Sequence, residues 1–203
     1  MLEFSPEVKD ALTEIFNIGI GQAADVLSTL VNEEVELSVP EVGIDRRADF
    51  VGFARAQWTD RASVVREDFT GPFSGDALLI FPVQQSLELV RSLLPDSVVL
   101  ETMTELEREA MIEVGNVVLN ACLSSIADIL EREFTNSLPT YIESEPATLI
   151  EQLVPDPERY IIYLRIEFVI HSRNIRGFIL FVLDLPAIDA FVAAANQLVN
   201  RFQ

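Results

Sequence analysis

Two pairs of polar residues with one spacing are the groups in this sequence best suited to chemistry. Glu14 and Asn17 are three residues apart, and Glu113 and Asn116 repeat the same types at the same spacing. Residues three apart on a helix point the same way, so each pair can contact one object. The amide can hold and orient a water molecule, and the carboxylate can pair with a cation on a docked partner. Such a pair suits hydrolysis of an acyl phosphate on another protein, where placing the water supplies most of the rate.

The two pairs belong to a longer internal repeat. A single Glu-x-x-Asn would usually be a solvated helix surface, but here four positions agree without a gap at an offset of 99 residues. They are Asp10, Glu14, Asn17 and Pro40, which align with Glu109, Glu113, Asn116 and Pro139. The segments "SGDALLIFPV" and "RGFILFVLDL" also resemble each other at a slightly larger offset. We therefore expect one domain, 1–203, made of two intertwined repeats, about 1–98 and 99–203.

The segment "GIGQAA" from Gly19 offers a competing interpretation, because its G-x-G-x-x-A spacing is that of a dinucleotide-binding turn. That turn needs a preceding strand and a later acidic residue at the end of a second strand. Here the preceding residues form a helix start and a helical stripe instead. We place both glycines inside the helix. Gly19 then lies on the core side, where another element can approach closely, and Gly21 lies on the exposed stripe, where it leaves room for a partner.

The elements that position the two pairs are two long helices. Ser5 before Pro6 is a helix start, and Thr104 with Glu107 forms a capping box at the second start. At about 100° per residue, each helix has one apolar side and one polar stripe. The expected apolar sides are Val8, Leu12, Ile15, Gly19, Ala23, Leu27 and Leu30, and Met111, Val114, Val118, Cys122, Ile126 and Ile129. The polar stripes are Asp10, Glu14, Asn17 and Gly21, and Glu109, Glu113, Asn116 and Asn120.

Strand-like runs lie between and after the helices. They are 35–39, 49–58, 62–69, 76–81, 159–171 and 176–184, with Trp58 as a strand residue packing on the sheet. Short helical patterns follow at "QQSLELVRSLL" and "PAIDAFVAAANQLV". Because strands and helices come in blocks, the predicted class is α+β with mostly antiparallel pairing.

Composition excludes several kinds of function. The chain has 33 acidic against 14 basic residues, a net charge of −19, which argues against nucleic acid and anionic lipid as partners. Lys9 is the only lysine, and so acidic a surface fits a cytoplasm rich in salt, or else a protein with cationic partners. The sequence shows no run of 18 apolar residues and no secretion signal, so we expect a cytoplasmic protein without membrane insertion. One cysteine, Cys122, and one histidine, His171, exclude cysteine-cluster and multi-histidine metal sites. We expect Cys122 to be buried and His171 to lie at a turn.

The pattern D-x-x-x-E-x-x-N, followed by proline 23 positions after the asparagine, resembles the signature of the CheC family of chemotaxis phosphatases, relatives of CheX and FliY. The resemblance covers nearly the whole chain and implies a pseudo-twofold α+β fold with two long helices on one side of a shared sheet. It also implies that Asn17 and Asn116 place the attacking water at the phospho-aspartate of CheY. Glu14 and Glu113 would meet the active-site lysine of CheY. No cofactor is expected on this chain, because CheY carries its own Mg²⁺.

Two departures distinguish the second motif. Glu109 replaces the Asp or Ser that usually opens it, which puts Glu109 and Glu113 one turn apart, where both could compete for one lysine. Val118 stands where the first motif has Gly19. We expect the second site to work nonetheless, with Asp10, Gly21 and Glu109 contacting the partner.

The resemblance further implies binding of CheD, a receptor-modifying glutamine deamidase that boosts phosphatase activity. The implied docking element is a short helix within 146–154 that contains Gln152, although a plain connector helix fits the same residues. The leading hypothesis is a phosphatase for phosphorylated CheY, and the alternatives are a non-catalytic adaptor for CheD or the response regulator and a structural domain. Glu-Asn pairs in both halves favour catalysis, because a pure binder would have little need for the asparagines.

Overall fold

The computed structural model describes residues 4–31, 33–57, 61–71, 74–93, 103–170, 173–183, 189–194 and 196–197. Trp58 and His171, for which we predicted a strand and a turn, lie outside these ranges. The elements in chain order are α1 (Pro6–Val31), β1 (Val35–Arg46), α2 (Arg47–Gln57), β2 (Ala62–Thr70), β3 (Gly75–Pro82), α3 (Val83–Leu93), α4 (Glu105–Leu130), β4 (Thr135–Asn136), β5 (Thr140–Ser144), α5 (Pro146–Leu153), β6 (Tyr160–Ile170) and β7 (Arg173–Leu183). Residues 189–194 and 196–197 are also helical. The predicted α+β class is confirmed.

One predicted strand is wrong. The run at 49–58 is helical and forms α2. Its buried side chains are Phe50, Val51 and Ala54, whereas Gly52 and Phe53 between them are exposed. Burial therefore follows a helical period rather than strand alternation, and Phe50, which suggested a strand, packs on the buried side of a helix.

The strands form one antiparallel sheet in the order β1-β6-β7-β3-β2, with β4 and β5 both pairing with β2 at the far edge. Strands from before residue 98 alternate with strands from after it, since β6 and β7 separate β1 from β3. The order helix, strand, helix, two strands, helix occurs in both parts of the chain, apart from the two-residue β4. The helices α1 and α4 have 26 residues each. Descent of this arrangement from a duplication stays a prediction.

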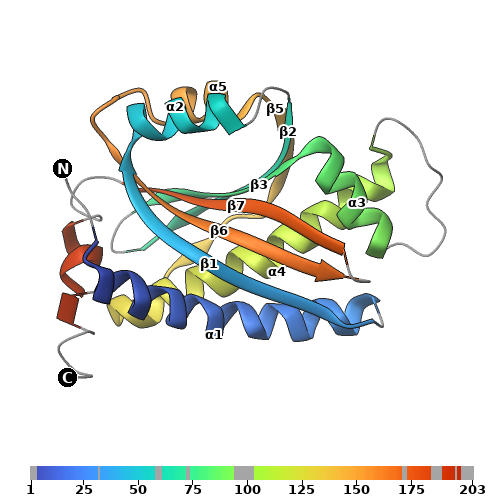
Figure 1. Cartoon of the computed structure of the whole chain (residues 1–203), viewed down its shortest axis with the longest axis horizontal. Helices are drawn as coiled ribbons and strands as arrows, with labels where there is room; N and C mark the ends of the chain where they lie inside the picture. The colour runs from blue at the N-terminus through green and yellow to red at the C-terminus, as the bar shows by residue number, and fades with distance from the viewer. Residues whose placement is uncertain are drawn as a thin grey trace.

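Helices cover both faces of the sheet, and a separate apolar core lies under each cover (Figure 1). The larger core is formed by α1 and α4 with inward side chains of the sheet, among them Val65, Leu79 and Phe181. The smaller core is formed by α2 and α5 with side chains of the opposite face, among them Val64 and Leu78. The two long helices that carry the Glu-Asn pairs therefore lie on the same side of the sheet.

The starts of the long helices follow the sequence signals. The Ser5 hydroxyl accepts a hydrogen bond from the Val8 amide at 3.3 Å. At α4 the predicted capping box is complete, with Thr104 and Glu107 bonding each other's backbone amides. These caps fix where each helix begins and hence which residues share its outer side.

The two long helices pack closely at Gly19. A Cβ at this position would lie 2.1 Å from the Ser125 hydroxyl oxygen and 3.2 Å from the Ala121 carbonyl oxygen, both on α4. The prediction that Gly19 permits close approach of another element is confirmed. Leu30, expected on the apolar side, is instead 57 % exposed, because the buried stripe of α1 runs through Phe16 and Ile20 and ends at Leu27.

Candidate functional site

The predicted acidic residues of both motifs lie on the outer surfaces of α1 and α4. Asp10 and Glu14 are exposed on α1, and Glu109 and Glu113 are exposed on α4. No ion pair joins Glu14 or Glu113 to another residue within the part of the chain that the structure describes. Both carboxylates are therefore available to a cation brought by a partner.

Asn17, one turn after Glu14, is half-buried and bonds to the neighbouring strand β1. Its Oδ1 accepts from the Val39 amide at 2.7 Å, and its Nδ2 donates to the Val39 carbonyl at 3.0 Å and to the Thr13 carbonyl at 2.8 Å. Val39 directly precedes the motif's Pro40. The amide thus has both N–H groups engaged and keeps one acceptor position on Oδ1.

Asn116, one turn after Glu113, is also half-buried but is held by a side chain. Its Oδ1 accepts from Nδ2 of Asn120 at 2.8 Å, and Asn120 also donates to the Asn116 carbonyl at 2.7 Å. Asn136 of β4 in turn donates to Oδ1 of Asn120. No residue in the described ranges bonds to Nδ2 of Asn116. This amide therefore keeps both N–H groups for an incoming molecule.

The surface around the first pair has room and apolar character. A Cβ at Gly21 would meet no atom within 4 Å, as expected for a residue that leaves space on the polar stripe. Ile18, Val26 and Leu30 of α1 are exposed. A shallow hollow of about 130 Å³ between α1 and α4 is lined by Ile18, among others. Exposed apolar side chains beside charged ones are typical of a surface that another protein covers.

Glu67 is a buried acid that sequence reasoning missed. It is 1 % exposed on β2, on the side of the sheet that faces α4, between the core residues Val65 and Phe69. Burial raises its pKa to about 7, although a hydrogen bond from Asn136 lowers it in part. The available signal was an acid at an inward position of the predicted strand 62–69, where alternation calls for an apolar residue.

Gln152 lies on the other side of the molecule. It is exposed on α5, which packs against α2 over the sheet face opposite α1 and α4. The predicted helix at 146–154 is confirmed. Binding of CheD by this helix stays a prediction.

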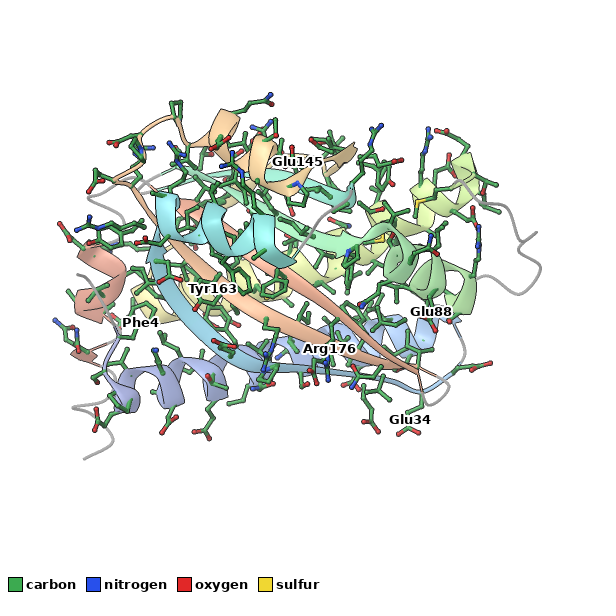
Figure 2. All side chains as sticks on the ribbon, turned by 45° about the horizontal axis from the view of Figure 1, so that its top comes forward. Phe4, Glu34, Glu88, Glu145, Tyr163 and Arg176 are labelled. Atoms are coloured by element: carbon green, nitrogen blue, oxygen red, sulfur yellow. The ribbon has the colours of Figure 1, made fainter. Side chains whose placement is uncertain are left out.

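A larger hollow lies on the face of the sheet that carries α2. Its volume is about 420 Å³, and Phe50, Phe178, Tyr163 and Arg176 are among its lining residues. Figure 2 shows Tyr163 and Arg176 on the sheet ribbon in front of the helices that carry the Glu-Asn pairs. Burial, with Asp45 and Glu41 nearby, raises the pKa of Tyr163 to about 12. The hollow is separated from both pairs by the sheet.

The apolar side of α4 is packed in the larger core. Met111, Val114, Val118, Cys122 and Ile126 are all buried, and the thiol of Cys122 has its pKa raised by burial. Residues Glu105–Asp128 are long and apolar enough to cross a membrane by length and composition alone, and half of their most apolar 18-residue window is buried within the protein. Core helices of water-soluble proteins have the same length and composition.

Solved structures of other proteins share this fold. The structure is similar to FliY of Thermotoga maritima, with a TM-score of 0.74 and 20 % identity over 96 % of this chain and 98 % of that one. It is also similar to the middle domain of FliM from Helicobacter pylori, with a TM-score of 0.66 and 14 % identity over 94 % and 99 %. The chain therefore has the α+β fold of this group.

The sequence comparison is narrower. Residues 7–44 match the CheC-like family, a segment that contains Asp10, Glu14, Asn17 and Pro40. The chain is 29 % identical over 140 residues to the CheY-P phosphatase CheC of Bacillus subtilis (strain 168), covering 66 % of this chain and 65 % of that relative. The match thus spans just under two thirds of the relative's length. These findings confirm the resemblance to the CheC family that the first motif indicated.

Proposed function

We propose that the protein hydrolyses the phospho-aspartate of a CheY-type response regulator. The observation that carries this proposal is the pair of exposed carboxylates, Glu14 and Glu113, each one turn before a half-buried asparagine on neighbouring helices. The first of these pairs lies in the CheC-like segment, and the similar Bacillus protein is named a CheY-P phosphatase. The regulator's active site supplies a positively charged partner, which neither carboxylate has within the described part of this chain.

In this reaction a water molecule attacks phosphorus and the bond between phosphorus and the aspartyl oxygen breaks. The products are inorganic phosphate and the free aspartate carboxylate of the regulator. Asn17 or Asn116 orients the water, while Glu14 or Glu113 pairs with the regulator's lysine and sets the docking angle. The Mg²⁺ that neutralises the phosphoryl oxygens belongs to the regulator, and this chain supplies only position and charge.

The two sites differ in what their amides offer. Asn116 keeps free N–H groups, whereas both N–H groups of Asn17 are bonded within the protein and only Oδ1 can accept from a water. We therefore expect the second site to supply the larger share of activity, although its Glu109 departs from the family motif.

A second candidate is a non-catalytic adaptor with the same fold. Two observations favour it: Asn17 has a structural use that does not require catalysis, since it ties α1 to β1, and the fold is shared with FliM. An adaptor would use the exposed surface of α1 and α4 to bind the regulator without hydrolysis.

Decay of the acyl phosphate on a cognate CheY, followed in molar salt with and without this protein, separates the two candidates. A phosphatase accelerates decay, and Glu14→Ala together with Glu113→Ala lowers the acceleration at least tenfold while the protein stays folded. Glu34→Ala, an exposed acid beyond the end of α1, serves as the matched control and leaves the rate unchanged. Binding of CheY-phosphate without any acceleration would favour the adaptor.

Binding of CheD through α5 is a separate proposal. Gln152 is exposed on α5, on the sheet face opposite the two pairs, so CheD and CheY would not compete for one surface. Calorimetric titration with CheD tests this, with Gln152→Ala expected to weaken binding and Gln84→Ala, an exposed glutamine on α3, expected to leave it intact. Equal affinity of the two variants would exclude α5 as the docking element.

A further inference from the structure

The two candidate asparagines are held in different ways although they occupy equivalent positions. Asn17 takes its hydrogen bonds from the backbone of Val39. The residue that aligns with Val39 in the second motif is Leu138, which is 88 % exposed, whereas Val39 is fully buried. The segment after α4 therefore does not lie against Asn116 as β1 lies against Asn17.

Asn120 takes over this role in the second motif. It aligns with Gly21 of the first motif, which has no side chain and open space around it. The Asn120 amide donates to Oδ1 of Asn116 at 2.8 Å. The replacement of a glycine by an asparagine thus coincides with the loss of the backbone clamp.

Asn120 is itself held from the interior. Asn136 donates to its Oδ1, and Asn136 also hydrogen-bonds to Glu67 on β2. Asn136 lies opposite Phe69 in the β2–β4 pairing, two residues along β2 from Glu67. A continuous chain of side chains therefore leads from a fully buried carboxyl group to the half-buried amide of Asn116.

Two oxygens in this series of hydrogen-bonded side chains have no donor among the described residues. They are Oε2 of Glu67 and Oδ1 of Asn136. Buried acceptors without a donor are costly. A proton on Glu67 supplies a donor, and burial favours the neutral acid by raising the pKa of this group to about 7. Neutral Glu67 is therefore compatible with its place in the core.

We propose that Asn120, Asn136 and Glu67 are positioning residues for Asn116, which fix its amide so that its free N–H groups face the water that attacks the incoming phosphoryl group. The catalytic importance of these residues rests on the proposed function. The orientation of the Asn116 amide does not, because it is a property of the free protein. Only the second site has this chain of side chains, because Gly21 takes the place of Asn120 in the first.

The kinetic test uses the Glu14→Ala background, in which the second site carries the measured CheY-phosphate hydrolysis. Asn120→Ala and Glu67→Leu are expected to lower kcat about tenfold with KM changed less than twofold, since a misplaced group costs rate more than docking. Glu67→Gln, which keeps a donor and an acceptor, is expected to retain kcat. Asn174→Ala, an exposed asparagine on β7, is the matched control.

A second measurement does not depend on activity. The side-chain amide resonances of Asn116, assigned by comparison with Asn116→Asp, are expected to shift in Asn120→Ala and to stay in place in Glu67→Gln and Asn174→Ala. Loss of kcat together with this shift supports the proposal, and an unchanged kcat and unchanged resonances in Asn120→Ala overturn it. If the wild-type protein does not hydrolyse CheY-phosphate, the proposed function fails, and the resonances alone then decide whether Asn120 holds Asn116. Asn120→Ala also decides the outcome if Glu67→Leu does not fold.

Discussion

At the scale of single residues, one side-chain type serves two purposes in this protein. An asparagine amide carries two donors and an acceptor on a short stem, so it can join a helix to a strand or present itself to a ligand. Asn17 does the first with three hydrogen bonds, and Asn116 is arranged for the second. The contacts of each amide, and not its place in the motif, decide what it can do.

This difference predicts unequal costs of truncation. Asn17→Ala leaves the Val39 amide and carbonyl without their side-chain partner and is expected to lower the free energy of unfolding by about 2 kcal/mol. Asn116→Ala removes one acceptor at a half-buried position and is expected to cost about 0.5–1 kcal/mol. Urea denaturation of both variants measures the difference, and equal costs would contradict a clamping role for Asn17.

A second prediction concerns the pH dependence that Glu67 gives to stability. Its carboxyl group has a usual pKa of 4.5 in the unfolded chain and about 7 in the folded protein. Between these values the folded state holds a proton that the unfolded state has released, so the free energy of unfolding falls as pH rises through this window. The fall amounts to on the order of 3 kcal/mol and is nearly complete by about pH 8.

Glu67→Gln has no such titration and is the direct comparison. Its free energy of unfolding relative to the wild type is expected to rise by about 2–3 kcal/mol between pH 5 and pH 8. Denaturant titrations at four pH values give the two curves, and parallel curves would show that Glu67 titrates normally in the folded protein.

Part of the candidate site could be predicted from the sequence because it depends on helical spacing alone. The exposure of Glu14 and Glu113 follows from their angles on two capped helices. The contact between Asn120 and Asn116 follows from the same spacing, because both lie on the polar stripe of one helix, but the partners of Asn17 and Glu67 could not be predicted in the same way. They come from Val39 and Asn136, whose contacts depend on how the strands after each long helix are placed.

At the scale of elements, the contact between α1 and α4 sets where the two outer surfaces meet. Gly19 has no side chain, and α4 therefore packs closely against it. A Cβ atom at Gly19 would lie only 3.2 Å from the Ala121 carbonyl oxygen of α4. Gly21, two residues on, has open space on the outer side. The two glycines therefore form a matched pair for substitution.

Gly19→Leu is expected to force the long helices apart and to lower the free energy of unfolding by more than about 2 kcal/mol. Gly21→Leu is expected to keep or slightly raise stability, because leucine is the better helix former by about 0.5–1 kcal/mol. In the Glu113→Ala background, where the first site carries the hydrolysis of CheY-phosphate, Gly21→Leu should block the reaction if the partner covers this position. Thermal unfolding of both glycine variants and the hydrolysis assay in this background check these outcomes, and unchanged hydrolysis on adding Gly21→Leu to Glu113→Ala would remove Gly21 from the docking surface.

Most elements could be predicted because each has a clear period and a clear start. The exceptions are the short strands β4 and β5, which were not predicted, and α2, where Phe50, Val51 and Phe53 carry strand-forming side chains in an eleven-residue helix. Packing against α5 and the sheet gives this segment its helical form, which local preference does not indicate. Tertiary contacts of this kind are not visible in a short window of sequence.

At the scale of the whole molecule, a net charge of −19 is spread over a protein whose apolar side chains fill two cores. Like charges on so small a surface repel one another, and this repulsion opposes the compact state until salt screens it. We therefore expect the midpoint of thermal unfolding to rise by about 5 °C or more between 0.1 M and 2 M KCl.

A variant with Glu34, Glu36 and Glu133 changed to lysine tests the cause, since all three are exposed acids. Its unfolding midpoint should be higher than that of the wild type in low salt and should rise less on adding KCl. An equal rise in both proteins would assign the effect of salt to something other than the screening of surface charge.

The alternation of early and late strands in the sheet also governs how the protein can be made. While the ribosome is still adding residues beyond 98, β1 has no neighbour and β3 has an open edge, because β6 and β7 have not been synthesised. The nascent chain must keep these edges from pairing with other chains until β6 and β7 emerge. The many acidic side chains make neighbouring copies repel one another during that interval. The same negative charge therefore lowers the stability of the folded protein and opposes aggregation of the incomplete chain.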